Sequence, residues 1–573
     1  MSDNKPSSPV HIRVPLNTHP SHLNTPSSRY GAVVDDNSSS YYYSAAGDSI
    51  NSTPVGSPSL SLRGQIESFA GSYSRTSALY MAENLSITNR LSNSNPPTRH
   101  GEDDVESLSN SHHEENIKSK LVPIEYTLTQ TLSQQPGYHL FPSLSRHTTV
   151  ASVISQQFNS TQQQHDPHYT ASPIRSTFMQ SIFNSINVLV GIGVLALPLG
   201  FRCAGWFFGS CIFFFCTFAT NYTAKLIAKC LDFYPNSTTY GDMGAAAFGD
   251  RGRTFVSTIF VVELMTIGVA MVVLLGDGIE SLFPNVDMFT IRVGSFLVLT
   301  PMLFLPIRKL AYTSLIGIIS CACLVTIVLY DGFSKKTKPG SLIEPMETEI
   351  FPSELYNIPL SFGLMMAGFA GHAVFPAIYR DMEEPKRYER MVDITYVITV
   401  AVYITMAIAG YAMFGLETMQ EITQNLATTP GYSKWINRLA IWLIVLTPLA
   451  KYGLMMNPVS VTWELWITSY ANVELWCKYH SWRKPFLAGV GRILASAIVI
   501  MVATVFPGFD RIMSLLGALF SFGISAIFPL VCYVKLFHQD LTLKDNVLIY
   551  SILAVSIIMA AFGTIWSFLP NNL

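Results

Sequence analysis

The stretch SIFNSINVLVGIGVLALPLG, at residues 181–200, opens the first long apolar segment of the chain but carries glycines and a proline in its middle. Both residue types disfavour a helix interior, and irregular backbone is tolerated in a membrane only where protein or a water-filled cavity surrounds it. A second stretch, MAGFAGHAVFP at residues 366–376, repeats the arrangement, and in both a proline follows five residues after a glycine. Two interrupted apolar segments in corresponding halves of a chain point to the binding site of a secondary transporter. The two stretches therefore predict where a transported substrate binds.

The composition of the chain is that of a membrane protein. Of its 573 residues, 49% are hydrophobic and only 13% are charged, whereas soluble domains carry about 25% charged residues. The net charge of −2 and the lack of a basic stripe give no support to nucleic-acid binding. The eight cysteines lie mostly in or beside apolar segments, without the spacing of a zinc site. We find no nucleophile–base set, phosphate-binding loop or metal motif, so we expect no enzyme activity, no cofactor and no bound metal.

The chain divides near residue 172 into two parts of different composition. Residues 1–172 are rich in Ser, Thr, Asn, Gln and Pro. Such a segment cannot bury enough apolar surface to fold, so we expect a disordered cytosolic tail. Thr53 and Ser57, each followed by Pro, and the stretch around Arg146 resemble kinase substrates, which favours a regulatory tail with kinases among its partners; a passive tail is equally compatible with this composition. The remainder, 173–573, forms the membrane domain.

Eleven apolar segments are predicted to cross the lipid bilayer as helices, which takes about twenty residues each. Lys and Arg are more frequent in the loops on the side of the tail, which places the N-terminus in the cytosol and the C-terminus on the opposite side. Spans one and six are the interrupted ones, so the pattern favours an all-α polytopic fold built as a five-plus-five inverted repeat with one extra helix. The predicted spans are residues 177–199, 204–230, 254–276, 289–306, 311–332, 357–378, 392–414, 435–457, 486–506, 511–536 and 546–568.

The two broken spans also suggest a class of substrate. The N-terminal ends of half-helices carry a partial positive charge and attract an anionic group. Backbone carbonyls released by the break attract a cation or an ammonium group. A zwitterionic amino acid carries a carboxylate for the half-helix ends and an ammonium for the released carbonyls, so it can bind to both at once.

Several motifs resemble one known family. NSINVLVGIGVLALPLGFRCAGW (184–206) resembles the first-helix signature of the amino acid/auxin permease family. More narrowly, the resemblance is to fungal vacuolar amino-acid transporters, through PGSLIEPMET (339–348), AGHAVFP (370–376) and LTPLAKYGLMMNPV (446–459). The resemblance covers about residues 175–568 and departs from the family's pattern at Ala370, where a Gly is expected.

This resemblance implies an eleven-helix, LeuT-like fold and proton-coupled transport of amino acids across the membrane of an acidic organelle. We expect the transported amino acids to be neutral and large. We therefore expect a protein of the vacuolar membrane that exchanges protons for cytosolic amino acids by alternating access, with its C-terminus in the lumen. Two alternatives stay open, namely proton-coupled efflux from the vacuole and an amino-acid sensor that signals through the tail. A channel is disfavoured because the sequence has no ring of charges and no carbonyl filter motif.

Span one is expected to bind substrate through the backbone of its unwound part and through the side chain of Asn187, which can donate and accept hydrogen bonds. The resemblance places Asn187 in the binding site, and a hydrogen bond between helices is the alternative. In span six, glycines permit close approach of the backbone, and Phe369 is expected to wall the side-chain pocket. The substrate-binding candidates are Asn187, Val190, Gly191, Gly193, Gly368, Phe369, Gly371 and Thr447.

Lys451 lies in the middle of span eight, where a charge is expensive and by default marks a functional site. In sodium-coupled relatives of this fold, span eight supplies hydroxyls beside the carbonyls of broken span one. A fixed ammonium there would replace sodium and bind the carbonyls released at Gly191 and Gly193. Alternatively, Lys451 is itself the group that titrates, or it only snorkels from a cavity wall. Thr447, one turn earlier on the same face, would assist it.

Two further residues are candidates for proton coupling together with Lys451. Glu263 lies within span three and is expected to carry the proton or to pair with Lys451, unless it merely binds a backbone or hydroxyl donor. His372 would shuttle or sense protons, because histidine titrates close to physiological pH. A structural, hydrogen-bonded histidine is the alternative.

Overall fold

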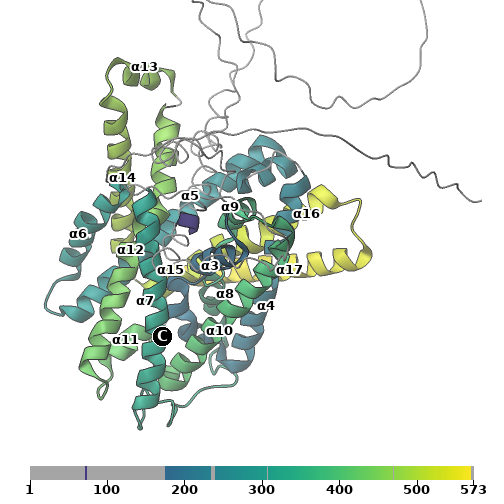
Figure 1. Ribbon diagram of the computed structural model, residues 1–573. Coiled ribbons are helices and arrows are strands. Elements are labelled where there is room, and N and C mark those ends of the chain that lie inside the picture. The colour runs from purple at the N-terminus through teal and green to yellow at the C-terminus, as the bar shows by residue number, and fades with distance from the viewer. Residues whose placement is uncertain are drawn as a thin grey trace, which may run out of the picture. The chain divides into compact units, whose positions relative to one another are not determined.

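The computed structural model describes residues 71–73, 76, 175–233, 239–305, 307–468, 470–506 and 508–569. Within these ranges all regular structure is helical, apart from one isolated bridge between Ser176 and Met382. By length and composition, nine helices in this described part could cross a membrane, and Met288–Phe304 is a shorter apolar segment. The prediction of an all-helical, multi-pass membrane protein is confirmed (Figure 1).

The first predicted span is interrupted at its glycines. Helix α3 (Phe178–Leu189) begins with a capping box in which Thr177 and Gln180 bind each other's backbone N–H groups. The chain leaves the helix at Val190 and Gly191, both extended, and resumes as the 3-10 helix η1 (Ile192–Ala196). This break lies where the Gly-rich sequence predicts it.

Helix α4 (Leu197–Phe233) contains both the end of the first predicted span and the whole of the second. The chain turns at Gly205, at the start of the predicted second span, where φ is 67°. A Cβ at Gly205 would lie 2.8 Å from the carbonyl oxygen of Ile350, so both the backbone angle and the space require glycine here.

The sixth predicted span is interrupted in the same way. Helix α8 (Ile358–Ala367) ends at Gly368, and the chain resumes as the short η4 (His372–Val374) and helix α9 (Phe375–Asp381). Pro376 lies in the first turn of α9, where the missing N–H costs no hydrogen bond.

The remaining helices follow the predicted spans, with some differences at their ends. Helix α12 (Lys434–Thr468) runs past the predicted end at residue 457, because the helix accommodates both Pro448 and Pro458 in its interior. Two short helices, α11 (Ile422–Thr428) and α13 (Ala471–Tyr479), lie in loops for which no helix is predicted. The others are α5 (Tyr240–Leu282), α6 (Met288–Leu299) with η2 (Thr300–Phe304), α7 (Ile307–Ser334), α10 (Tyr388–Phe414), α14 (Arg483–Val505), α15 (Phe509–Leu515), the π-helix η7 (Leu516–Ile527), α16 (Phe528–Phe537), α17 (Leu543–Phe568) and the one-turn 3-10 helices η3 (Leu355–Asn357), η5 (Pro385–Arg387) and η6 (Gly415–Glu417).

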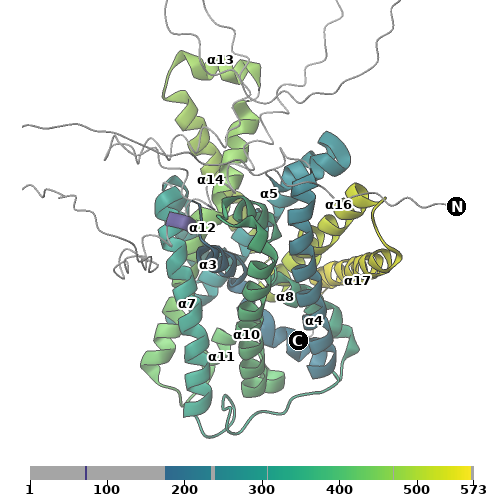
Figure 2. The ribbon, with the colours of Figure 1, turned by 45° about the vertical axis from the view of Figure 1, so that its right-hand side comes forward.

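Broken span one lies inside the helix bundle. Figures 1 and 2 both show α3 among α7, α8, α10 and α12. Large apolar side chains such as Phe207, Phe214 and Phe218 are exposed on the outer face of α4, as expected of a surface that contacts lipid. The polar groups of the broken segments are therefore surrounded by protein.

Four residues of the N-terminal tail are described, and they are helical: Gly71, Ser72, Tyr73 and Thr76. The last three are buried, and this short purple helix lies beside α3 in both views (Figures 1 and 2). The hydroxyls of Ser72 and Thr76 hydrogen-bond to Ser176 and Asp381 of the membrane domain. The predicted kinase sites at Thr53, Ser57 and around Arg146 lie outside the described residues.

Candidate functional site

The two broken spans touch each other at glycines. A Cβ at Gly193 would lie 2.8 Å from the Cα of Gly368, and a Cβ at Gly371 would lie 2.8 Å from Cγ1 of Val188. Real Cβ atoms do not approach other heavy atoms this closely. The atoms that face Gly193 belong to the backbone of span six, and those that face Gly371 belong to side chains of span one, so both contacts depend on glycine. Three of the predicted site residues thus form one crossing point.

Tyr403 joins the two breaks through a single hydroxyl. Its oxygen lies 2.7 Å from the carbonyl of Leu189 and 2.6 Å from the carbonyl of Gly368. A hydroxyl has only one hydrogen to donate, so two released carbonyls share one donor. Tyr403 is not among the predicted site residues. A tyrosine inside the apolar span 392–414 is nevertheless a signal, since a buried Tyr hydroxyl needs a partner.

Lys451 binds the backbone of broken span one. Its side chain is 3% exposed, and its Nζ donates to the carbonyl of Val190 at 3.3 Å. The carbonyl of Gly191 instead accepts a bond from the N–H of Val194 at 3.4 Å, so the released carbonyl that Lys451 meets is that of Val190. The stem of Lys451 packs on Gly317 of α7, where a Cβ would lie 2.7 Å from its Cε.

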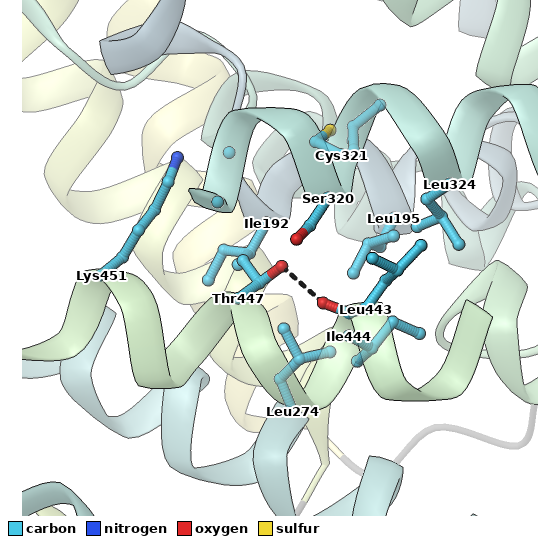
Figure 3. Close-up of a pocket in the computed structure, with 13 residues that line it drawn as sticks. Ile192, Leu195, Leu274, Ser320, Cys321, Leu324, Leu443, Ile444, Thr447 and Lys451 are labelled. Carbon is cyan, nitrogen blue, oxygen red and sulfur yellow. Dashed lines mark hydrogen bonds between the residues drawn. The ribbon is translucent and has the colours of Figure 1, made fainter. Parts of the chain in front are cut away.

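A small cavity lies beside Lys451, between η1, α5, α7 and α12 (Figure 3). Three predicted residues line it, namely Gly191, Thr447 and Lys451. The hydroxyl of Thr447 donates to the carbonyl of Leu443 at 2.9 Å, which leaves its oxygen as an acceptor. The other lining residues are Ile192, Val194, Leu195, Leu274, Gly317, Ser320, Cys321, Leu324, Leu443 and Ile444.

Ser320 of α7 is a polar cavity residue that is not among the predicted site residues. Figure 3 shows its hydroxyl directed toward α12, and the hydroxyl donates to the carbonyl of Ile316 at 2.9 Å. Small residues in the run GIISCAC (317–323) are the signal for a helix face that leaves space. Of the predicted substrate-binding residues, those that do not line the cavity are Asn187, Val190, Gly193, Gly368, Phe369 and Gly371.

Asn187 is buried with open hydrogen-bonding capacity. Its exposed fraction is 1%, and neither its amide nitrogen nor its oxygen has a partner among the described residues. The neighbouring hydroxyl of Ser185 is satisfied within its own helix, since it donates to the carbonyl of Ser181 at 2.8 Å. A buried polar group without a partner requires an explanation, and a bound polar ligand supplies one.

Phe369 packs in an aromatic cluster. Its ring centre lies 5.6 Å from that of Phe213, 6.2 Å from that of Tyr396 and 5.4 Å from that of Tyr403. These rings belong to α4 and α10, so Phe369 faces these helices and contributes nothing to the cavity beside Lys451. It supports the tyrosine that joins the two breaks.

His372 connects three broken or bent segments. Its Nε2 lies 2.9 Å from the carbonyl of Thr220 and 3.0 Å from the hydroxyl of Thr223, which in turn donates to the carbonyl of Ser525 at 2.6 Å. Because a carbonyl only accepts, Nε2 carries a hydrogen, and the buried Nδ1 has no partner in the described part of the chain. This is the arrangement of a hydrogen-bonded structural histidine, placed away from the cavity.

Glu263 and Lys451 do not meet. Gly278 faces Val445 and Gly268 faces Met456, so α5 and α12 run antiparallel. By interpolation between these two contacts, the part of α5 that lies opposite Lys451 is near residue 273. Glu263 lies ten residues away, which is about 15 Å along a helix axis. The predicted pairing of the two charges is therefore wrong, and Glu263 stays a candidate proton carrier only.

A second buried carboxylate lies outside the spans, just before α11. Glu421 is 1% exposed, and burial, together with the nearby charge of Asp277, holds the pKa of its carboxyl well above the ordinary value. The neighbouring Gln424 donates its amide to the carboxylate of Asp277 at 3.4 Å. Helix α11 is thereby attached to the end of α5.

The sequence matches a known family over the whole described membrane domain. The family described as "Transmembrane amino acid transporter protein" matches residues 175–569. Two relatives from Arabidopsis thaliana, amino acid transporters AVT1E and AVT1B, are each 30% identical over 402 and 403 residues. The alignments cover 68% of this chain and 72% and 70% of the relatives. A solved Na+-coupled sialic acid symporter is 14% identical with a TM-score of 0.42, over 69% of this chain and 90% of that one.

Proposed function

Because the chain belongs to the transmembrane amino acid transporter family, we propose that it carries neutral, large amino acids across the vacuolar membrane in exchange for protons. The observation that carries the proposal is the meeting of two broken spans at glycines, with released carbonyls and the unpartnered Asn187 beside them. The proposal includes eleven spans in a five-plus-five inverted repeat, a cytosolic N-terminus and a luminal C-terminus. The vacuolar location and the coupling to protons are proposed because the motifs resemble those of vacuolar amino-acid transporters.

The chemistry of the crossing point suits a zwitterion. The carbonyls of Leu189 and Gly368 share one hydroxyl of Tyr403, and a substrate ammonium would supply the donors that they lack. The amide of Asn187 and the N-terminal end of η1 would bind the carboxylate. In alternating access, α3 and α9 open one side of this site, and α8 and the start of α4 open the other.

Lys451 is the strongest candidate for coupling transport to protons. Its ammonium donates to the carbonyl of Val190 beside broken span one, which supports a role in place of a sodium ion. Loss of its proton would remove the charge from that contact and so change the backbone next to the substrate site. Glu263 and His372 are the other candidates, and their distance from the cavity makes them secondary.

The substrate site is tested by Asn187→Ala. We expect the apparent KM for amino acid to rise at least about tenfold, since a hydrogen bond to a charged group contributes about 1.5–3 kcal/mol. Ser185→Ala is the matched control, because that hydroxyl binds only its own helix and Met391, and its KM should stay at the wild-type value. Both variants are first quantified in the membrane. An unchanged KM for Asn187→Ala would exclude this residue from the site.

A further inference from the structure

The two broken spans are joined on the side where the tail enters. Ser176, just before α3, donates its N–H to the carbonyl of Asp381 at 2.7 Å and accepts a bond from the N–H of Glu383 at 2.9 Å. The guanidinium of Arg387 lies 4.0 Å from the ring centre of Phe178, within reach of a cation–π interaction. The N-terminal end of α3 and the C-terminal end of α9 are thus held together.

Two hydroxyls of the tail add further contacts to this junction. Ser72 hydrogen-bonds the hydroxyl of Ser176 at 2.6 Å, and Thr76 donates to the carboxylate of Asp381 at 3.4 Å. On α3, the amide of Asn184 donates to the hydroxyls of Ser72 and Thr76 at 2.9 Å and 3.1 Å. The exposed fractions of these five residues are 0–6%. The tail therefore binds both broken spans at once.

The hydrogen bonds of the junction form a chain in which each group donates to the next, ending at the carboxylate of Asp381. Because the hydroxyl of Ser176 donates to the carboxylate of Asp381, it must accept the bond from Ser72, which in turn accepts from Asn184. Such a chain of donors that ends on a carboxylate strengthens each of its bonds. It exists only while α3, α9 and the tail are in contact.

We propose that Ser72 and Thr76 form a latch that holds the tail-side ends of α3 and α9 closed and thereby slows transport. The inference rests on the proposed transport function, because alternating access requires these two half-helices to separate on this side. A ligand or segment that binds only one of two conformations shifts the equilibrium toward it. The latch binds only the closed arrangement, so its release raises the transport rate.

A reversible disulfide tests the latch directly. Ser72→Cys combined with Ser176→Cys places two sulfurs where two oxygens now lie 2.6 Å apart, close to the S–S bond length of about 2.05 Å. We expect oxidation to form this bond, as read by peptide mapping, and to reduce the initial transport rate at least about tenfold. Reduction should restore the rate, and Ser72→Cys alone should respond to neither treatment.

A substitution tests release of the latch. Thr76→Ala removes the bonds to Asp381 and Asn184, and we expect its initial rate to rise about threefold to tenfold, corresponding to one or two hydrogen bonds. Thr258→Ala is the matched control, because that exposed hydroxyl binds only the carbonyl of Thr254 in its own helix. Its rate should equal that of the wild type.

The proposal is overturned if no disulfide forms, or if it forms and the transport rate does not change. A wild-type protein that transports no amino acid would contradict the proposed function instead. In that case the latch is tested without transport, by adding Asn187→Cys to the Ser72→Cys, Ser176→Cys variant. The rate at which a reagent added from the tail side alkylates the cysteine at position 187 is measured before and after oxidation. Slower alkylation after oxidation supports the latch, and an unchanged rate overturns it.

Discussion

Replacing Gly193 with Ala should reduce amino-acid transport to about 1% of the wild-type rate, since overpacking a close contact costs about 1–3 kcal/mol or more. The added Cβ would lie 2.8 Å from the Cα and 3.0 Å from the N of Gly368, and 3.2 Å from the carbonyl carbon of Ala367. All three are backbone atoms, which cannot move aside as a flexible side chain can. The two broken spans would be forced apart at the point where they form the proposed site.

Neighbouring glycines provide the controls for this prediction. A Cβ at Gly191 meets only the carbonyl oxygen of Leu189, at 3.9 Å, whereas one at Gly368 lies 3.0 Å from the ring of Tyr403. We therefore expect the initial uptake per protein in the membrane to fall most in Gly193→Ala, less in Gly368→Ala and least in Gly191→Ala. Equal uptake by the Gly193 and Gly191 variants would contradict a close contact of the two breaks.

Replacing Lys451 with Met should lower transport about 100-fold, because a hydrogen bond from a charged group contributes about 1.5–3 kcal/mol. Methionine keeps the length and much of the packing on Gly317 but leaves the carbonyl of Val190 without its donor. If the ammonium stands in for sodium, wild-type transport is also the same in sodium and in choline buffers.

A surface lysine separates this effect from the general loss of a charge. Lys335 bonds the carbonyl of Pro430 at an exposed site, so Lys335→Met should retain nearly full uptake. Both variants are compared for uptake in sodium and choline buffers after their amounts in the membrane are matched. Wild-type activity in Lys451→Met, or a strict need for sodium in the unmodified protein, would remove Lys451 from the coupling mechanism.

The two breaks could be predicted from the sequence because their cause is local. Gly191, Gly193, Gly368 and Gly371 disfavour helix at their own positions, and the α-helix is interrupted across each pair of them. The position of Lys451 could also be predicted, since a charge in an apolar span needs a polar partner. That partner is the carbonyl of Val190.

The contacts between segments could not be predicted in the same way. The shared hydroxyl of Tyr403, the separation of Glu263 from Lys451 and the contact of Thr76 with Asp381 each depend on which helix faces are turned together. Sequence periodicity gives the buried face of a helix but not its neighbour. The length of α12 could not be predicted either. Proline usually ends or kinks a helix, but α12 continues through Pro458.

The central claim is that a proton gradient drives amino-acid transport by this protein. The most direct measurement is uptake of labelled neutral amino acids into vacuole-type vesicles energised by ATP in sodium-free buffer, with and without a proton uncoupler. We predict that uptake occurs without sodium and falls, on adding the uncoupler, to the level of vesicles that lack the protein. Faster loss of amino acid from preloaded vesicles with an acidic interior would reverse the proposed direction, and uptake that persists in the presence of the uncoupler would contradict proton coupling.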